Sequence, residues 1–281
     1  MNNLYMIPLE VYSNGYIKSK FSNTNKKVIV LDLDETIGSF GELYLLWSLG
    51  LPSNVERNQQ TFNDLLDIYP EFLRYGILNI IDYLKYKKDN GSYFKTFIYT
   101  NNILPIEWVQ MIVNYIERKQ TSSGLFDKII PGFNKTIQCM RTTRDKTHSD
   151  FIHCAVLPRS TEICFIDDAY FDKMEYPTVY YIQPKRYNHM MKTSDIVERF
   201  ANSRFADPLN RLDVRDLLYQ TFIQNGLLNT TGKDTLEVSI DIIVSKKIMY
   251  HIKEFFLMSV RKTKTRKRRD YTIGRFTRRK S

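Results

Sequence analysis

The sequence lacks the features that mark several classes of protein. No apolar run is long enough to span a bilayer, and the first eight residues lack the basic and apolar stretches of a signal peptide. The three cysteines (Cys139, Cys154 and Cys164) include no C-x-x-C pair, and the four histidines have no metal-ligand spacing. No internal repeat is visible. These absences predict an intracellular protein with buried, reduced thiols.

Acidic charge is also scarce, but only in one part of the chain. The formal net charge is +10, and residues 261–281 hold 11 Lys and Arg with a single acid, Asp270. The rest of the chain has as many acidic as basic residues. We therefore expect a disordered basic tail over 261–281, which could be a nuclear address or a contact for nucleic acid or another polyanion.

The remaining sequence alternates between strand and helix patterns, which is typical of an α/β fold with a parallel sheet. Apolar strand patterns occur at 27–32, 95–100, 128–131, 162–167 and 178–183, and helical patterns at 69–87, 106–119 and 145–156. Further helices are predicted at 194–205, 214–228 and 236–260. The predicted organisation comprises a lead-in over 1–25, an α/β domain over 26–192 with an insertion at about 39–66, a helical appendage over 193–260, and the tail.

The most informative stretch is the apolar run Val28-Ile29-Val30-Leu31, which leads into Asp32, Asp34 and Thr36. Such a run predicts a buried parallel strand. Two carboxylates at its end need a partner, because burying unpaired charge is costly. A divalent cation at the carboxyl edge of the sheet is the partner we expect.

Three other polar groups stand where later elements begin or end. Thr100 ends the strand at 95–100 and Asn101 follows it, while Asp167 ends the strand at 162–167 and Asp168 follows it. Lys146 lies between them, near the start of a predicted helix. Each of these groups also has a purely structural interpretation when it is considered alone. The acid pair could form a helix N-cap, and the Thr100 hydroxyl could cap a helix in the same way.

Together, these pieces resemble the four ordered motifs of the haloacid dehalogenase-like phosphohydrolases, over about residues 26–185. The segment Asp32-Leu33-Asp34-Glu35-Thr36 resembles the NLI-interacting-factor-like branch, which includes the CTD phosphatases. Its continuation through Ile37 and Gly38, with the basic tail, is more similar to members encoded by large DNA viruses. The resemblance implies a Rossmann-like, doubly wound parallel sheet with strand order 3-2-1-4-5.

The resemblance also implies roles for the motif residues. Asp32 would be the nucleophile that forms an aspartyl-phosphate, and Asp34 the general acid and base. Mg²⁺ would be held by Asp32, the Asp34 carbonyl and Asp168, with Asp167 a ligand through water or an orienting group. The phosphoryl oxygens would be bound by Thr100, Asn101 and Lys146, with Arg144 a rival for the lysine.

The resulting hypothesis is an Mg²⁺-dependent phosphatase that acts on phosphorylated Ser or Thr of a protein. Three features depart from the branch: Ile37-Gly38 follows the first motif, the fourth motif is Asp-Asp, and no strand-rich insert is evident in 39–62. The basic tail suggests one alternative, a phosphatase for nucleotides or nucleic-acid ends. Another alternative is a non-catalytic binding or virion protein on the same fold. The expected location is the cytoplasm or nucleus of the cell or host cell, with the virion as the alternative.

Overall fold

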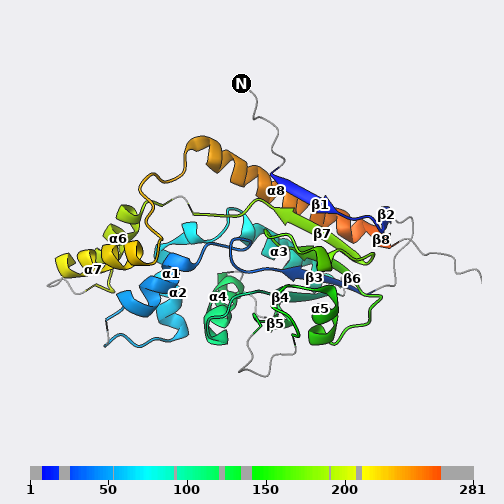
Figure 1. The fold of residues 1–281 in the computed structure, drawn as a ribbon, viewed down its shortest axis with the longest axis horizontal. Helices are drawn as coiled ribbons and strands as arrows, with labels where there is room; N and C mark the ends of the chain where they lie inside the picture. Colours follow the sequence, from blue (N-terminus) through cyan, green and yellow to red (C-terminus); the bar gives the residue numbers. More distant parts are fainter. Residues whose placement is uncertain are drawn as a thin grey trace, which may run out of the picture.

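A six-stranded sheet forms the centre of the protein (Figure 1). The computed structural model describes residues 8–18, 26–52, 54–91, 94–119, 124–133, 141–189, 191–206 and 211–260. The strands lie in the order β1-β7-β6-β3-β4-β5, all parallel except β1. Their bounds are β1 Leu9–Tyr12, β3 Lys27–Leu31, β4 Phe94–Tyr99, β5 Lys128–Ile130, β6 Glu162–Ile166 and β7 Val179–Pro184. The predicted α/β class with a mostly parallel sheet is confirmed, and the arrangement is compatible with a Rossmann-like fold.

Both faces of the sheet are covered by helices, which is why the central strand β3 is apolar from Val28 to Leu31. Val28 and Val30 pack in the layer that contains α5 (His148–Ala155), while Ile29 and Leu31 pack in the opposite layer. That opposite layer contains α3 (Ile77–Asp89), α4 (Ile106–Lys119) and α8 (Thr235–Leu257). Alternation along the strand places successive side chains on opposite faces. All five residues of β3 are therefore buried.

The segment between β3 and α3 is helical, and α3 begins later in the chain than the sequence predicts. It contains α1 (Gly41–Leu45), a π-helical turn at Leu46–Gly50, α2 (Gln59–Ile68) and a 3₁₀ turn at Pro70–Phe72. The predicted helix over 69–87 is wrong at its start, because Pro70 opens the 3₁₀ turn and Gly76 takes a left-handed conformation with φ 71°. The strands β6 and β7 are joined by a further 3₁₀ turn, Asp172–Met174.

The region after 192 holds α6 (Thr193–Ala201), α7 (Arg211–Gln224) and α8. The predicted helix over 236–260 is wrong at its end, because residues 258–260 form the strand β8 (Met258–Val260). This strand pairs antiparallel with β2 (Tyr16–Lys18) in a separate two-stranded sheet. The lead-in thus supplies β2 as well as the edge strand β1. The predicted tail over 261–281 and Cys139 lie outside the described residues.

Buried apolar side chains of α6, α7 and α8 belong to the same hydrophobic core as Ile29 and Leu31 of the central strand. The Tyr180 hydroxyl of β7 lies 2.9 Å from Nδ1 of His251 on α8, and the Tyr180 ring lies 5.9 Å from that of Phe255. Within the ranges that the structure describes, no helix combines the length and apolar composition needed to cross a bilayer.

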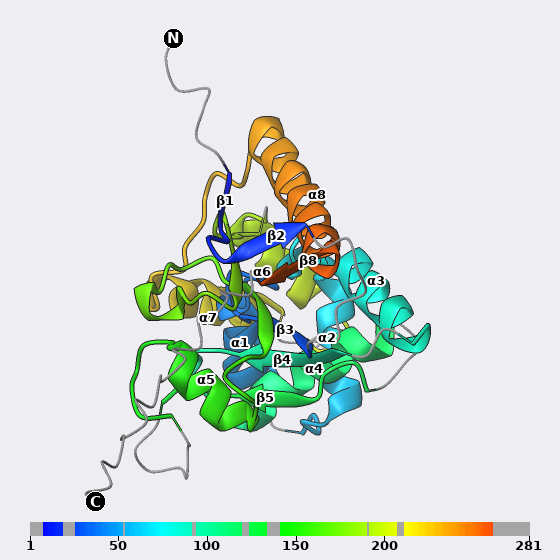
Figure 2. The same cartoon turned by 90° about the vertical axis from the view of Figure 1, so that its right-hand side faces the viewer.

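Lys27 ties the start of the central strand to the end of α8. Its side chain is 10% exposed, and Nζ donates to the backbone oxygens of Phe255, at 2.6 Å, and Met258. Glu162, the first residue of β6, provides a carboxylate 3.4 Å away. Figure 2 shows β2 and β8 close to this end of α8. The buried ammonium therefore joins segments from both ends of the described chain.

We expect Lys27→Met to lower the free energy of unfolding by about 3 kcal/mol, because it removes a buried ammonium that lies beside the Glu162 carboxylate and donates to two backbone oxygens. The matched control is Lys18→Met in β2, whose side chain is 80% exposed and lies 3.9 Å from Glu254. That control should change stability by less than about 0.5 kcal/mol. Urea denaturation of the full chain measures both values, and equal losses would contradict the role given to Lys27.

Candidate functional site

A cavity of about 430 Å³ opens beside the carboxyl ends of β3, β4 and β6. Ligands of open α/β sheets bind at this kind of edge. The structure brings all seven residues of the predicted site to its walls: Asp32, Asp34, Thr100, Asn101, Lys146, Asp167 and Asp168. Residues more than 130 positions apart in the sequence therefore share one cavity.

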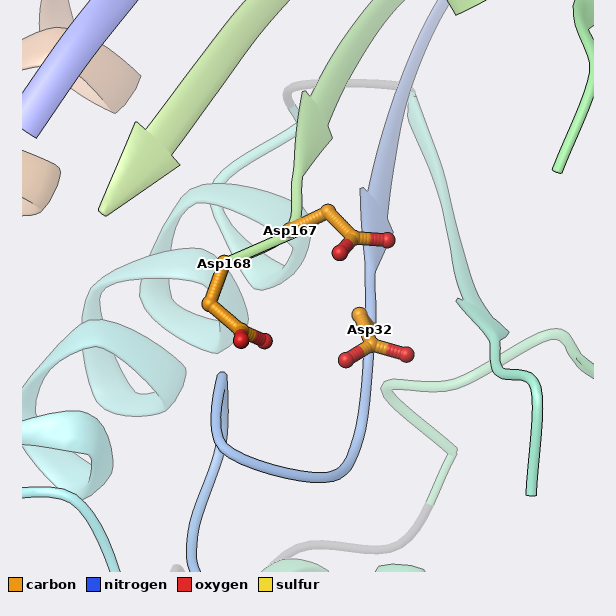
Figure 3. Close-up of side chains that lie close together, drawn as sticks. All are labelled: Asp32, Asp167 and Asp168. Atoms are coloured by element: carbon orange, nitrogen blue, oxygen red, sulfur yellow. The ribbon is translucent and has the colours of Figure 1, made fainter. Parts of the chain in front are cut away.

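Three carboxylates converge at the centre of this cavity. Asp32 follows β3, and Asp167 and Asp168 follow β6, as Figure 3 shows. The two strands are neighbours, and the Asp32 amide donates to the Ile166 carbonyl oxygen at 2.9 Å. Each residue offers an oxygen within 4.8 Å of the others, so the cluster could hold a metal ion. The Asp34 carboxylate is not part of this cluster; the predicted ligand role of its backbone carbonyl stays a prediction.

Lys146 provides a positive charge beside two of the three carboxylates. Its Nζ donates to Asp167 at 2.6 Å and also to Asp32, and its side chain is 2% exposed. Burial alone would lower the pKa of Lys146, but the two carboxylates raise it above the ordinary value, so the ammonium stays charged. Arg144 is exposed and does not line the cavity. Of the two rival cations, Lys146 is the one at the site.

The loop before α5 places Lys146. Thr147 caps the helix, because its hydroxyl accepts from the Asp150 amide at 3.0 Å. The Thr147 amide in turn donates to the Tyr99 hydroxyl at 3.2 Å, which anchors the loop to the end of β4. Lys146 is therefore held between a helix cap and the sheet.

Asp34 lies beside the cluster in a different environment. Its carboxylate accepts a hydrogen bond from the side-chain Nδ2 of Asn102 at 2.9 Å. Burial raises the pKa of Asp34 to about 7, with a further contribution from Asp32 and against the effect of the Asn102 hydrogen bond. A carboxyl group that titrates near neutrality can both donate and accept a proton at that pH.

Thr36 fixes the orientation of Asp168. Its hydroxyl donates to Asp168 Oδ1 at 2.8 Å and accepts from the Asp168 amide at 2.9 Å. Asp168 is thereby held by the loop that carries Asp32 and Asp34. Such a partner orients a carboxylate that binds a metal.

Among the residues that the structure describes, the acids outnumber the cations around the cavity. Burial raises the pKa of Asp167 and Asp168, and Asp32 adds to the shift in both cases, while Lys146 and Thr36 oppose it. Crowded carboxylates with too little positive charge are the environment that a bound divalent cation balances. The donor set of carboxylate oxygens is also the type that Mg²⁺ prefers.

Thr100 and Asn101 are held by a buried arginine that the sequence did not single out. Arg141 is 2% exposed and donates to the Thr100 carbonyl oxygen at 2.9 Å and to Asn101 Oδ1 at 2.8 Å. The Thr100 hydroxyl accepts from the Asn102 amide at 3.0 Å. Arg141 therefore positions the loop after β4, on which the predicted phosphate-binding groups lie.

Arg74 holds the loop after β3 and was also missed. It is 1% exposed and donates to the carbonyl oxygens of Glu35, at 2.6 Å, Thr36, and Lys185, at 2.9 Å. Glu35 has φ 57°, a left-handed conformation that costs energy in a residue with a side chain. Arg74 thus stabilises a strained turn directly after Asp34. A lone arginine within a predicted helix gave no signal of this contact.

A second cation, Arg186, lies at the cavity wall. Its Nη2 is 3.1 Å from Glu35 Oε2, and its side chain is 65% exposed. No sequence motif contains it, because it follows β7 outside the four ordered segments.

No protein-family model matches this chain, and neither a curated protein nor a solved structure matches it.

We expect the full chain to bind Mg²⁺ and Thr36→Val to weaken that binding by about tenfold, because Asp168 loses its orienting hydroxyl. Thr36→Ser keeps the hydroxyl and should bind close to the wild-type affinity. Isothermal titration with MgCl₂ measures all three. Unchanged affinity in Thr36→Val would show that Asp168 needs no support from the loop.

Proposed function

We propose that this chain is an Mg²⁺-dependent phosphomonoester hydrolase that acts through an aspartyl-phosphate. The observation that carries the proposal is the single cavity in which Lys146 bridges Asp32 and Asp167, with Asp34 alongside at a raised pKa. These residues meet the needs of nucleophilic phosphoryl transfer: a carboxylate, an acid and base beside it, and fixed positive charge.

In the first step, an Asp32 carboxylate oxygen attacks phosphorus and the bond from phosphorus to the ester oxygen breaks. Asp34 donates its proton to the leaving oxygen as that bond breaks. Lys146 stabilises the charge shared between Asp32 and the phosphoryl group. Thr100 and Asn101 bind the phosphoryl oxygens and hold them in line with the attack.

In the second step, the Asp34 carboxylate accepts a proton from water as the water oxygen attacks phosphorus. The bond between phosphorus and Asp32 breaks, which releases phosphate and restores both carboxyl groups. Mg²⁺, held by Asp32, Asp168 and the Asp34 carbonyl with Asp167 in support, would supply charge neutralisation for the phosphoryl oxygens.

We further propose a phosphorylated Ser or Thr of a protein as the substrate. The cavity is lined by five acids, including Glu35, and within the described part of the chain by two cations, Lys146 and Arg186. A nucleic acid carries many phosphates, which this negative charge would repel, whereas a singly phosphorylated peptide carries only one phosphate. Ile103, 76% exposed, and the half-buried Phe171 line the same cavity and suit apolar residues flanking a phosphoserine.

A phosphatase for nucleic-acid ends is the second candidate, and the observation that favours it is the basic segment 261–281. The expected intracellular or virion location, and polyanion contact through this segment, stay predictions.

We expect Asp32→Asn to lower the turnover of 4-nitrophenyl phosphate with Mg²⁺ by at least about 10³-fold, because the amide cannot form the phosphoenzyme. Asp172→Asn, an exposed acid after β6, is the matched control and should keep wild-type activity. Steady-state assays measure both. Undiminished activity in Asp32→Asn would exclude the mechanism. If the wild type is folded and binds Mg²⁺ but turns over none of a panel of phosphate esters, the result would favour a binding protein.

We expect a phosphoserine peptide to be turned over at least tenfold more efficiently than a 5′-phosphorylated oligonucleotide, because of the acidic cavity wall. The assay compares kcat/KM for the two substrates in the full chain and in a chain ending at Val260, at low and high salt. A preference for the oligonucleotide that falls with salt and with removal of 261–281 would instead support the second candidate.

A further inference from the structure

The helix α8 carries a line of large apolar side chains on its solvent side. Leu236, Ile243, Tyr250 and Leu257 recur every seven residues, and each is at least 47% exposed. Seven residues make almost two helical turns, so these side chains leave the helix in nearly the same direction. Both views of the fold place α8 along its margin (Figure 1 and Figure 2). We call these four residues the α8 stripe.

The α8 stripe is separate from the face that packs against the rest of the protein. Val244, Ile248, Ile252 and Phe255 of the same helix are buried in the core that contains Leu31 of the central strand. A helix at a protein surface is usually apolar on the inner side alone. A second apolar line on the solvent side indicates a surface that binds another apolar surface.

The charge beside the α8 stripe is positive. Lys246 and Lys253 are exposed, each three residues after an apolar member of the stripe. The structure describes every residue of α8, and none of the exposed ones is an acid. Glu254 is partly buried and lies 3.9 Å from Lys18 of β2. An anionic surface would therefore complement this side of the helix.

The sequence after α8 adds to the positive charge. Residues 261–281 begin four positions after Leu257 and contain 11 Lys and Arg with one acid. Anionic lipid headgroups attract polybasic segments, and apolar side chains of a surface helix enter the boundary between headgroups and acyl chains. The stripe and the basic segment therefore suit the same kind of surface.

A helical protein partner fits the α8 stripe less well than a lipid surface. A coiled-coil seam needs two apolar positions in each heptad, and the second position here is occupied by Ser239, Lys246 and Lys253. Two copies paired antiparallel through the stripe would also bring together the lysines at its middle, Lys246 and Lys247. A lipid surface needs one apolar line, because lysine stems can lie along it with their ammonium groups among the headgroups.

We propose that α8 binds the surface of an anionic lipid bilayer. The side chains of the α8 stripe enter the headgroup boundary, and the flanking lysines with segment 261–281 contact anionic headgroups. Tyr250 suits this depth, because its ring is apolar and its hydroxyl is polar. No member of the stripe is among the residues that line the candidate active site. The inference therefore does not depend on the proposed reaction.

The test is sedimentation of the full chain with vesicles of phosphatidylcholine that contain phosphatidylserine, and with vesicles of phosphatidylcholine alone. We expect saturable binding to the anionic vesicles and at least about tenfold weaker binding to the neutral ones, because the basic groups need anionic headgroups. If the folded chain does not bind the anionic vesicles, or binds both kinds equally, the proposal is overturned.

Two double variants separate the α8 stripe from the basic segment. Ile243→Gln with Tyr250→Gln removes the middle of the stripe, whereas Leu217→Gln with Ile223→Gln removes side chains on α7 that are 54% and 50% exposed. We expect the α8 variant to bind anionic vesicles at least about tenfold more weakly, because it loses apolar contact. The α7 variant should bind like the wild type, with both variants folded by circular dichroism. Equal binding by the wild type and the α8 variant would show that the basic segment acts alone, and the proposal would fail.

The oligomeric state tests the other occupant of the stripe, a second copy of the chain. Light scattering after size-exclusion chromatography measures the mass of the wild type and of the α8 variant without lipid. We expect the two masses to be equal. A dimeric wild type that the α8 variant converts to a monomer would show that a second copy covers the stripe, which would overturn the proposal.

Discussion

The buried ammonium of Lys146 between Asp32 and Asp167 is the interaction on which the candidate site depends. Two carboxylates from neighbouring strands could not approach one another in a dry interior without it, because their repulsion grows as water is excluded. The ion bridge also joins three separate parts of the chain: the end of β3, the end of β6 and the loop before α5. The sheet places the two carboxylates side by side, and the ammonium of Lys146 offsets the repulsion between them.

The strand ends could be predicted from the sequence because two physical signals coincide there. Apolar runs that switch abruptly to acids or hydroxyls, as at Asp32 and Asp167, mark where a buried strand leaves the core. Parallel strands then bring these ends to one edge. The choice between Lys146 and Arg144 could not be made in this way, since it depends on the Thr147 cap and its contact with Tyr99.

Other features have no local signature. The acceptors of Arg74 are backbone carbonyls, which every residue provides, so composition and spacing cannot reveal them. The edge strand β1 pairs with β7 from about 170 residues away, and its short sequence resembles many loops. Both cases are tertiary contacts that a local pattern does not reveal. The late start of α3 differs from them, because Pro70 and Gly76 are local signals whose effects were outweighed in the sequence by a long apolar stripe.

The contact of Lys27 with the backbone of Phe255 and Met258 has a consequence for synthesis of the chain. Every residue of the candidate active site is translated well before α8. The first residue of the central strand nevertheless acquires its buried acceptors only after residue 258 has been added. The last strand of the sheet, β7, ends at Pro184, so at about 5 to 20 residues per second the delay before Met258 is added is roughly 4 to 15 s. During that interval the nascent sheet has a lysine without its two backbone acceptors and an apolar face that α8 does not yet cover, so the ribosome-bound intermediate is the state in which we expect the protein to be most prone to aggregate.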